Sequence, residues 1–507
     1  MSTTQHSQAR RDVPVALALL GLAALLVAIP LGGRATMAAV VVNLALVALA
    51  LRETRVPVVT WPNAIGLLVG VVWLIPIKGY ALPVELPFNL EHYRLLLVLL
   101  VFALVVAVLV EQVRLTTAGA LGPLVLLGVG SIVSMVLNLG AIDASTGETG
   151  SAVKAASYFV AFLVVYVLVC SVLTSQQSLD TVARALVLGG TVVAVAAIYE
   201  ARAGYNPFDH LGDWLPGFER QFREVFEERA GRLRVYASAQ HPIALGVALL
   251  LVAPLAVYLS TRARSVARSR LWVAAAVTLA VGATATISRT IVVMAVVMGI
   301  TALGLRRRQV LRLWPLVLLL PFVIHFAAPG AMGGLYKSFF PERGIISNLQ
   351  GRAGAGGSGR LADVGPALEL WLERPVVGHG LGIEFPATDV SRTPGQAAAP
   401  LIFDDQYLST LTRLGLLGIV GLVWLVWGGG IRLYRAARRT TGPSSDLLAA
   451  CAVATLGFGA AMVFYDGVAF VQSAIVFIII LALGSRAALL PAAVVTPAEP
   501  NRRGGHA

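Results

Sequence analysis

Two adjacent carboxylates are the residues of this sequence best placed to take part in chemistry. Asp404 and Asp405 stand directly before Gln406-Tyr-Leu, at the start of a long apolar stretch. One of two neighbouring carboxylates can have its pKa raised by the other, which suits a general base for a hydroxyl group near neutral pH. The same pair can instead cap a helix, because an Asp at a helix start accepts from free backbone N–H groups. The sequence leaves both interpretations open.

A single arginine stands between two apolar runs, in the short turn Ser288-Arg289-Thr290. Such a side chain can end a membrane span by reaching from it towards water, and do nothing more. It can also be a fixed cation that faces an anionic head group at the membrane surface. We favour the second interpretation for Arg289 because almost no polar loop surrounds it.

Asp405, Arg234, Tyr407 and His379 are candidates for substrate contact, and Arg360 is a further candidate for catalysis. Arg234 stands directly before an apolar run, and Arg360 follows a connector with five glycines between residues 351 and 359. This connector is not a nucleotide-binding P-loop, since no Lys-Ser/Thr pair follows its glycines. Tyr407 follows the acidic pair, and His379 lies in a glycine-rich turn. No residue is spaced to complete a metal site with His379, so we expect no metal and no other cofactor.

The composition is that of a membrane protein. Of the 507 residues 57% are hydrophobic and only 13% are charged, whereas about a quarter of a soluble domain is charged. The apolar residues come in runs long enough for membrane-spanning helices. The net charge of +13 is concentrated in short basic loops between these runs, as the positive-inside rule describes, so we expect no nucleic-acid partner.

Fourteen apolar runs are near the length needed to cross the lipid bilayer. They fall at about residues 13–31, 35–51, 61–77, 95–110, 118–137, 155–173, 182–199, 239–260, 271–287, 290–305, 313–328, 409–430, 446–464 and 468–485. If the N-terminus is inside and the spans alternate, the arginine clusters at 262–270, 306–312 and 432–439 all lie in the cytoplasm, as do both termini. The predicted fold class is an all-α polytopic membrane protein with about 14 (12–14) transmembrane helices.

The same alternation divides the chain into bundles and outer loops. We expect an N-terminal bundle (1–199), an extracytoplasmic loop (200–238), central helices (239–329), a large extracytoplasmic loop (330–408), C-terminal helices (409–486) and a disordered cytoplasmic tail (487–507). Apolar residues recur at helical spacing at Phe218, Phe222, Val225 and Phe226, and again at Leu361, Val364, Leu368 and Trp371. Both patterns predict short amphipathic helices in the outer loops.

These segments together resemble the O-antigen ligase and polymerase family of bacterial membrane glycosyltransferases. The matching stretches are, in order, the segment from Arg234 to Pro242, Ser288-Arg289, Gly359-Arg360 through to Gly378-His-Gly-Leu-Gly382, and Asp404-Asp405-Gln-Tyr-Leu with Gly415-Leu-Leu-Gly418. They cover roughly residues 180–430. The resemblance implies a multi-pass protein of the bacterial inner membrane.

The resemblance also implies a reaction and roles for residues. A glycan would pass from an undecaprenyl-pyrophosphate-linked donor to a glycan or lipid acceptor, without a metal. Arg289 and Arg360 would bind the pyrophosphate, and Asp404 would take the position of the base; guanidinium groups suit this task because they bind such anions bidentately. The lipid A–core ligases of the family carry a His where this chain has Asp404. We therefore prefer a polymerase, or a ligase for another cell-surface glycan.

Two other classes of function stay open. A transporter or flippase for lipid-linked oligosaccharides would also have many spans, but it would be expected to place polar or broken helices near the membrane midplane. Here the spans are nearly free of charge and the ionisable residues gather at one surface, which favours an enzyme. A non-catalytic scaffold of envelope assembly predicts that Arg289 and Asp404 can be replaced without loss of function.

Overall fold

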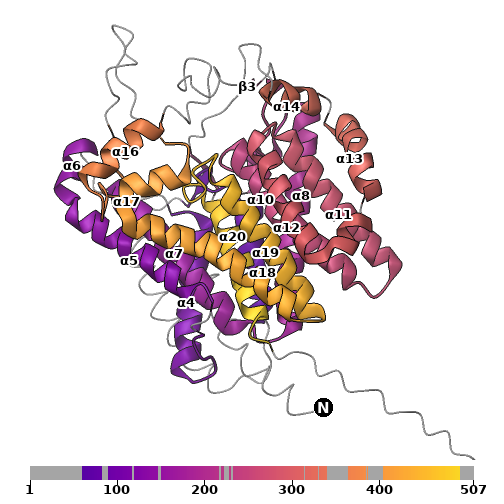
Figure 1. Ribbon diagram of the computed structural model, residues 1–507, viewed down its shortest axis with the longest axis horizontal. Coiled ribbons are helices and arrows are strands. Elements are labelled where there is room, and N and C mark those ends of the chain that lie inside the picture. The colour runs from indigo at the N-terminus through magenta and orange to yellow at the C-terminus, as the bar shows by residue number, and fades with distance from the viewer. Residues whose placement is uncertain are drawn as a thin grey trace, which may run out of the picture.

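The computed structural model describes residues 60–82, 90–116, 119–146, 150–215, 218–221, 228–229, 232–312, 314–328, 330–339, 363–383, 385 and 403–490. Within these residues the protein is a bundle of long helices whose connecting segments carry only short elements (Figure 1). The expected helical, multi-pass fold is confirmed.

Eight helices of the described residues are long and apolar enough to cross a membrane. They are α4 (His92–Leu109), α7 (Gly150–Val172), α8 (Gln176–Ala203), α10 (Pro242–Thr261), α11 (Val266–Ala285), α12 (Arg289–Arg312), the stretch formed by α17 (Gln406–Val423), a π-helical turn (Trp424–Gly428) and α18 (Gly429–Arg439), and α19 (Pro443–Ala461). Shorter apolar helices are α3 (Trp61–Leu74), α5 (Leu121–Leu137), α13 (Trp314–Ala327) and α20 (Val471–Ala487). Every apolar run expected from residue 61 onward therefore contains a helix. The runs at 13–31 and 35–51 lie outside the described residues, so the total of fourteen stays a prediction.

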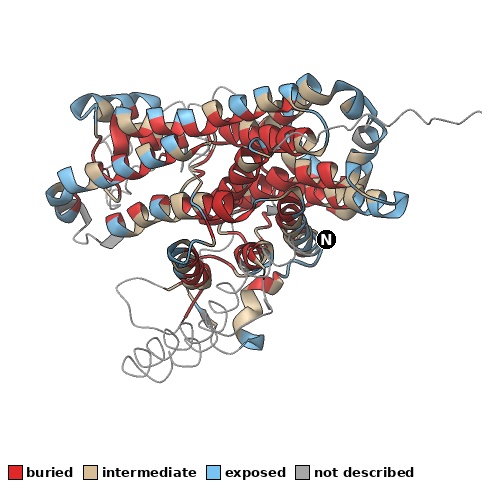
Figure 2. Ribbon diagram, turned by 90° about the horizontal axis from the view of Figure 1, so that it is seen from below, coloured by how far each residue is buried: buried red, intermediate tan, exposed pale blue. Residues whose placement is uncertain are grey.

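The centre of the bundle is formed by helices that are apolar on every side. In α19 83% of the spanning window is buried, and in α10 72%; nearly all of α20 is buried as well. A helix that is hydrophobic all round belongs inside a bundle, and α10 and α20 both pack against α19. Figure 2 shows the buried residues gathered at the centre and the exposed ones on the outer helices. Exposed apolar side chains such as Val98, Leu188 and Val296 are those that a bilayer would cover.

Short elements gather at one end of the bundle, at the top of Figure 1. They include α6 (Leu139–Thr146), the 3-10 turn η2 (Pro207–His210), α9 (Leu211–Trp214), α14 (Ala331–Phe339) and α16 (Val364–Glu373). Two antiparallel strand pairs join β1 (Tyr80–Ala81) to β2 (Glu219–Arg220) and β3 (Glu228–Arg229) to β4 (Arg232–Leu233). We call this end the site end, because the candidate functional residues lie here.

One of the two expected amphipathic helices is present, and most of the other lies outside the described residues. Helix α16 covers most of the second pattern, although Leu361 lies outside the described residues. In the first pattern, residues 222–227 lie outside the described part of the chain, and the flanking pairs β2 and β3 are extended. The Phe218 ring stacks on His92 at 4.3 Å and packs edge-on against Tyr80 at 5.7 Å. Pairing with β1 then holds the following residues extended.

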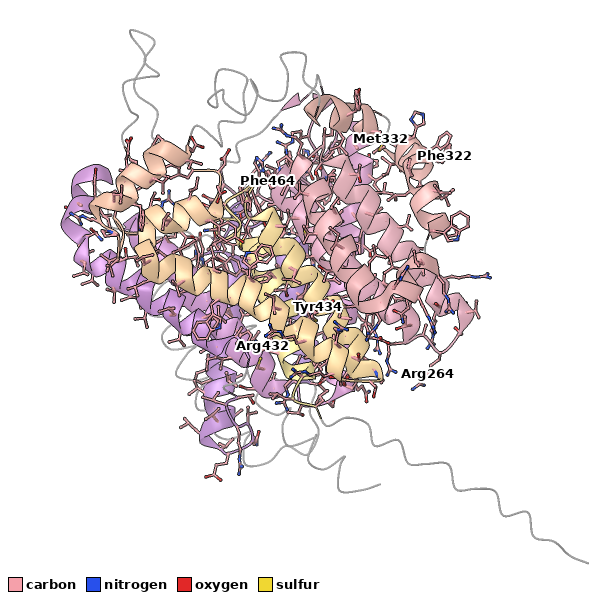
Figure 3. The ribbon with its side chains drawn as sticks, viewed as in Figure 1. Arg264, Phe322, Met332, Arg432, Tyr434 and Phe464 are labelled. Carbon is pink, nitrogen blue, oxygen red and sulfur yellow. The ribbon has the colours of Figure 1, made fainter. Side chains whose placement is uncertain are left out.

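The basic loops lie together at the other end of the bundle, which we call the arginine end. Figure 3 labels Arg264 and Arg432 there, far from Met332 and Phe464 at the site end. Arg306 donates to Asp446 at the start of α19 at 3.1 Å, and Arg432 donates to the carbonyl oxygen of Gly119. The alternation of the spans thus brings the arginine clusters to one end. Which side of the membrane this end faces stays a prediction.

Helix α17 is broken at Gly415, whose backbone angles are φ 61° and ψ −153°. The groups left free by this break are bonded by the turn that follows α16. His379 N and Gly380 N donate to the carbonyls of Thr412 and Arg413 at 3.0 and 2.9 Å, and Leu416 N donates to Pro375 O at 2.8 Å. In a membrane protein, irregular backbone is stable only where other parts of the chain satisfy it in this way. The turn therefore fixes the first two turns of α17.

Candidate functional site

The segment from Arg234 to His241 and the turn before α12 form the first part of the site. Arg234 is buried, and its Nε donates to the carbonyl oxygen of Thr286 at 3.2 Å. Arg289, the first residue of α12, follows three residues later and is partly buried. Two arginines that are far apart in sequence are thus brought to the same turn.

The backbone at this place is held in an unusual conformation. Ala237 and Ile287 have φ values of 41° and 50°, in the left-handed region that residues with a Cβ rarely adopt. Such positions cost about 1–3 kcal/mol each and persist only where the surroundings enforce them, often at functional sites.

The buried carboxylate of Glu200, near the end of α8, enforces the conformation of Ala237. It accepts from Ala237 N at 2.8 Å and from Tyr236 N at 3.3 Å. Asn206 Nδ2 donates to Ala237 O at 2.9 Å, and the Tyr236 hydroxyl donates to Asp209 at 2.6 Å. Sequence reasoning missed Glu200. Its only signal was an acidic residue at the very end of an apolar run.

The start of α17 separates the roles of the two adjacent carboxylates. Asp405 is the helix cap: its Oδ1 accepts from Tyr407 N at 2.7 Å and from Leu408 N at 3.1 Å. Asp404 precedes the cap and is exposed. Capping therefore falls to Asp405, and Asp404 is the residue of the pair that capping does not occupy.

A third carboxylate, Asp466, lies in the turn between α19 and α20 and is partly buried. Ser409 of α17 donates to its Oδ2 at 3.4 Å. Burial raises the pKa of Asp466, nearby Arg413 opposes this effect, and the negative charge of Asp404 adds to it. Sequence reasoning missed this residue as well, although it is the one acidic residue between the last two apolar runs.

A cavity of about 130 Å³ opens beside Asp466. Its polar lining includes Lys78, Gln406, Ser409, Arg413 and Asp466, and its aromatic lining is Tyr158 and Phe159 of α7. Lys78 has the left-handed φ value of 62°, so a strained residue stands here too. Much of its side chain is exposed, but desolvation of the ammonium group, followed by repulsion from Lys154, lowers the pKa of Lys78.

The turn between α19 and α20 joins the two parts of the site. At one end, where the turn passes into α20, Val471 N donates to Gln240 Oε1 at 3.1 Å, and Gln472 Nε2 donates to Ser238 Oγ at 3.2 Å. At the other end, Val468 N donates to Gln406 Oε1 at 2.6 Å. Phe464 of this turn is labelled at the site end in Figure 3. The Arg234 segment and the start of α17 are therefore bound to one loop.

Two of the predicted substrate-binding residues have partners within the protein. The ring of His379 is buried, with Nε2 2.7 Å from the carbonyl oxygen of Leu370 and the ring 5.6 Å from that of Phe385. The Tyr407 hydroxyl donates to Gly459 O at 2.9 Å and accepts from Trp427 Nε1 at 2.8 Å. The Tyr407 contacts hold the start of α17 in place, whereas the ring of His379 is held by α16 and Phe385. Contact with a substrate stays a prediction for these two residues.

Arg360 lies outside the described residues, so its predicted pairing with Arg289 stays a prediction. Within the described ranges, no three His, Cys, Asp or Glu side chains are grouped so that they could hold a metal ion.

Comparison with known families identifies the region around these residues. Residues 274–423 match the family model described as O-antigen ligase. The matched region begins in α11, contains Arg289, Arg360 and Asp404, and ends with α17. It includes three of the four stretches that carried the resemblance, and the segment from Arg234 to Pro242 precedes it. No curated protein matches the chain. Through this region the chain is similar to the O-antigen ligase and polymerase family.

Proposed function

We propose that the protein transfers a glycan from an undecaprenyl-pyrophosphate-linked donor to a glycan or other cell-surface acceptor, at the outer face of the bacterial inner membrane. The observation that carries the proposal is the joining of the Arg234–Arg289 turn to the Asp404 end of α17 by one loop, within and beside an O-antigen ligase domain. In this orientation the site end faces outwards, and the arginine end and both termini face the cytoplasm.

In the proposed reaction the acceptor hydroxyl oxygen attacks the anomeric carbon of the donor sugar. The bond from that carbon to the phosphate oxygen breaks, and the lipid pyrophosphate leaves with the electron pair. Asp404 takes the hydroxyl proton as the new glycosidic bond forms, a contribution typically worth about 10²- to 10⁴-fold in rate. An exposed carboxylate that is not needed for capping suits this role.

The arginines are proposed to stabilise the leaving group. Arg289 and Arg360 bind the pyrophosphate, whose negative charge grows as the bond breaks, and guanidinium groups can meet it bidentately. Arg234 adds positive charge beside Arg289, with its orientation fixed by the bond to Thr286. No step of this scheme requires a metal or another cofactor.

The acceptor is proposed to be something other than lipid A–core. Asp404 stands where the lipid A–core ligases of the family have a His, so the chain is better suited to polymerise a glycan or to ligate it to another surface acceptor.

The test is complementation of a deletion strain with wild type, Arg289→Ala or Asp404→Asn, at matched protein levels. Surface glycan is profiled on gels, and lipid-linked precursor is quantified in each leaflet. We expect both variants to lose long or attached glycan while precursor accumulates on the outer leaflet. Precursor held on the inner leaflet would indicate a flippase instead. Wild-type behaviour of both variants would show that these residues do not form the site.

A further inference from the structure

We propose that the cavity between α7, α17 and the α19–α20 turn binds one acidic sugar residue of the acceptor glycan, with Lys78 and Arg413 holding its carboxylate. This inference rests on the proposed function, since it names the class of sugar presented to Asp404. Lys78, Arg413 and Asp466 all line this cavity, and none of them was a candidate from the sequence.

Charge is the first argument. Lys78 and Arg413 line the cavity and Lys154 lies close to it, against the single lining carboxylate of Asp466. The neighbouring Arg94 is paired with Glu91 and so adds no net charge. The cavity therefore has an excess of positive charge, and an anionic group is the ligand that compensates it.

The state of Arg413 is the second argument. Its Nε is buried and has no hydrogen-bond partner among the described residues. A buried donor left without a partner is costly, about 1–3 kcal/mol, so such atoms call for an explanation. A ligand carboxylate in the cavity would supply the acceptor, in the geometry that guanidinium groups favour.

The walls of the cavity suit a sugar ring. Tyr158 and Phe159 provide aromatic surface, while Gln406, Ser409 and Thr410 provide polar groups. The volume of about 130 Å³ is roughly ten times the least space that holds one water molecule, which leaves room for one ring rather than for several.

The position of the cavity indicates that the bound sugar belongs to the acceptor and not to the donor. Ser409 and Arg413 lie one and two turns along α17 from the residues that precede it, Asp404 and Asp405. The charge of Asp404 also acts on Asp466 in the cavity wall. A sugar held here is therefore close to the proposed base, whereas Arg289 and the donor lie across the α19–α20 turn.

The experiment measures binding of D-glucuronate and D-glucose to the full chain in lipid nanodiscs, by ligand-observed NMR. The two sugars share a ring and differ only in whether C6 is a carboxylate. We expect glucuronate to bind at least about tenfold more tightly than glucose. Arg413→Gln and Lys78→Gln should each weaken glucuronate binding by about tenfold or more, and leave glucose unchanged. Arg264→Gln, an exposed arginine of the arginine end, is the matched control and should bind like wild type.

Other results would overturn the proposal. Equal binding of the two sugars, or no effect of either substitution, removes the acidic-sugar site. Displacement of glucuronate by inorganic phosphate at much lower concentration would assign the cavity to a phosphate group. Lys78→Gln, in an exposed turn, keeps the test valid if Arg413→Gln does not fold. Arg289→Gln separates the two hypotheses: it should bind glucuronate normally and fail in complementation. Normal complementation by Arg289→Gln would refute its role in transfer without affecting the cavity.

Discussion

Replacement of Gly415 by alanine tests the idea that the break in α17 positions the site. At φ 61° and ψ −153° this residue adopts a conformation that is nearly exclusive to glycine, and a side chain there costs about 1–3 kcal/mol. The added Cβ would also lie 2.5 Å from the carbonyl carbon and oxygen of Val376 and 2.7 Å from Gly378 N. These atoms are backbone and cannot rotate away, so the turn and the helix must separate.

Gly415→Ala should therefore lower the free energy of unfolding by at least about 3 kcal/mol. This is the upper end of the conformational cost, and the collision of the added Cβ adds to it. Separation would also break the bonds from His379 and Gly380 to α17 and displace Asp404. The assay is unfolding in mixed micelles titrated with sodium dodecyl sulfate, together with glycan complementation. Gly299→Ala is the control: no atom lies within 4 Å of the added Cβ, and an alanine inside a helix is favourable by up to about 1 kcal/mol. If Gly415→Ala unfolded like wild type and complemented fully, the break would not depend on glycine and the reasoning would fail.

Three further predictions concern the carboxylates. Asp404→Asn should keep wild-type stability and lower the rate of glycan transfer by about 10²- to 10⁴-fold. Asp405→Ser should retain the helix cap and most of the activity. A greater loss of activity in Asp405→Ser than in Asp404→Asn, measured in a transfer assay, would exchange their roles. Glu200→Gln should lose about 1–3 kcal/mol of stability and much activity, because one of the two backbone N–H bonds is lost; unchanged activity in complementation would remove Glu200 from the site. Glucuronate binding should weaken as pH rises, because Asp466 becomes charged at a pH above its ordinary range and Lys78 becomes neutral at a pH below its ordinary range. The other charges at the cavity are Arg413, Lys154 and Asp404. Glucuronate binding measured by NMR as a function of pH checks the trend. Asp466→Asn should remove the part of the pH dependence that occurs at lower pH, where Asp466 titrates.

The spans were predictable from the sequence because each depends on its own residues. An apolar run needs a bilayer or a bundle interior wherever it stands, and the helices from Trp61 onward follow those runs. The arginine clusters were predictable for the same reason, since they reach one end simply by alternation. Arg234, Arg289 and the acidic pair stood out in the sequence because each is a charge near the boundary of an apolar run, and their roles stay predictions.

The features that could not be predicted from the sequence depend on contacts between residues far apart in the chain. Nothing near Gly415 distinguishes it from the other glycines of an apolar run, since the break requires Val376 and Gly378 from another element. The strand pair at Glu219–Arg220 was not predictable, because Tyr80 pairs with it and His92 contacts the preceding Phe218 ring, both from more than a hundred residues earlier. Lys78, Arg413 and Asp466 come from three separate parts of the chain. No two of them are neighbours in sequence, so no local pattern predicts that they line one cavity.

The loop between α19 and α20 has a consequence for how such an enzyme could diverge. Because it is hydrogen bonded to Gln240 on one side and to Gln406 on the other, in the proposed reaction it would act as a spacer of fixed length between leaving group and nucleophile. The outer segments that meet the glycan can then change in length and composition without altering the reaction distance. Specificity for new sugars can evolve around a geometry that the buried helices α19 and α20 keep constant.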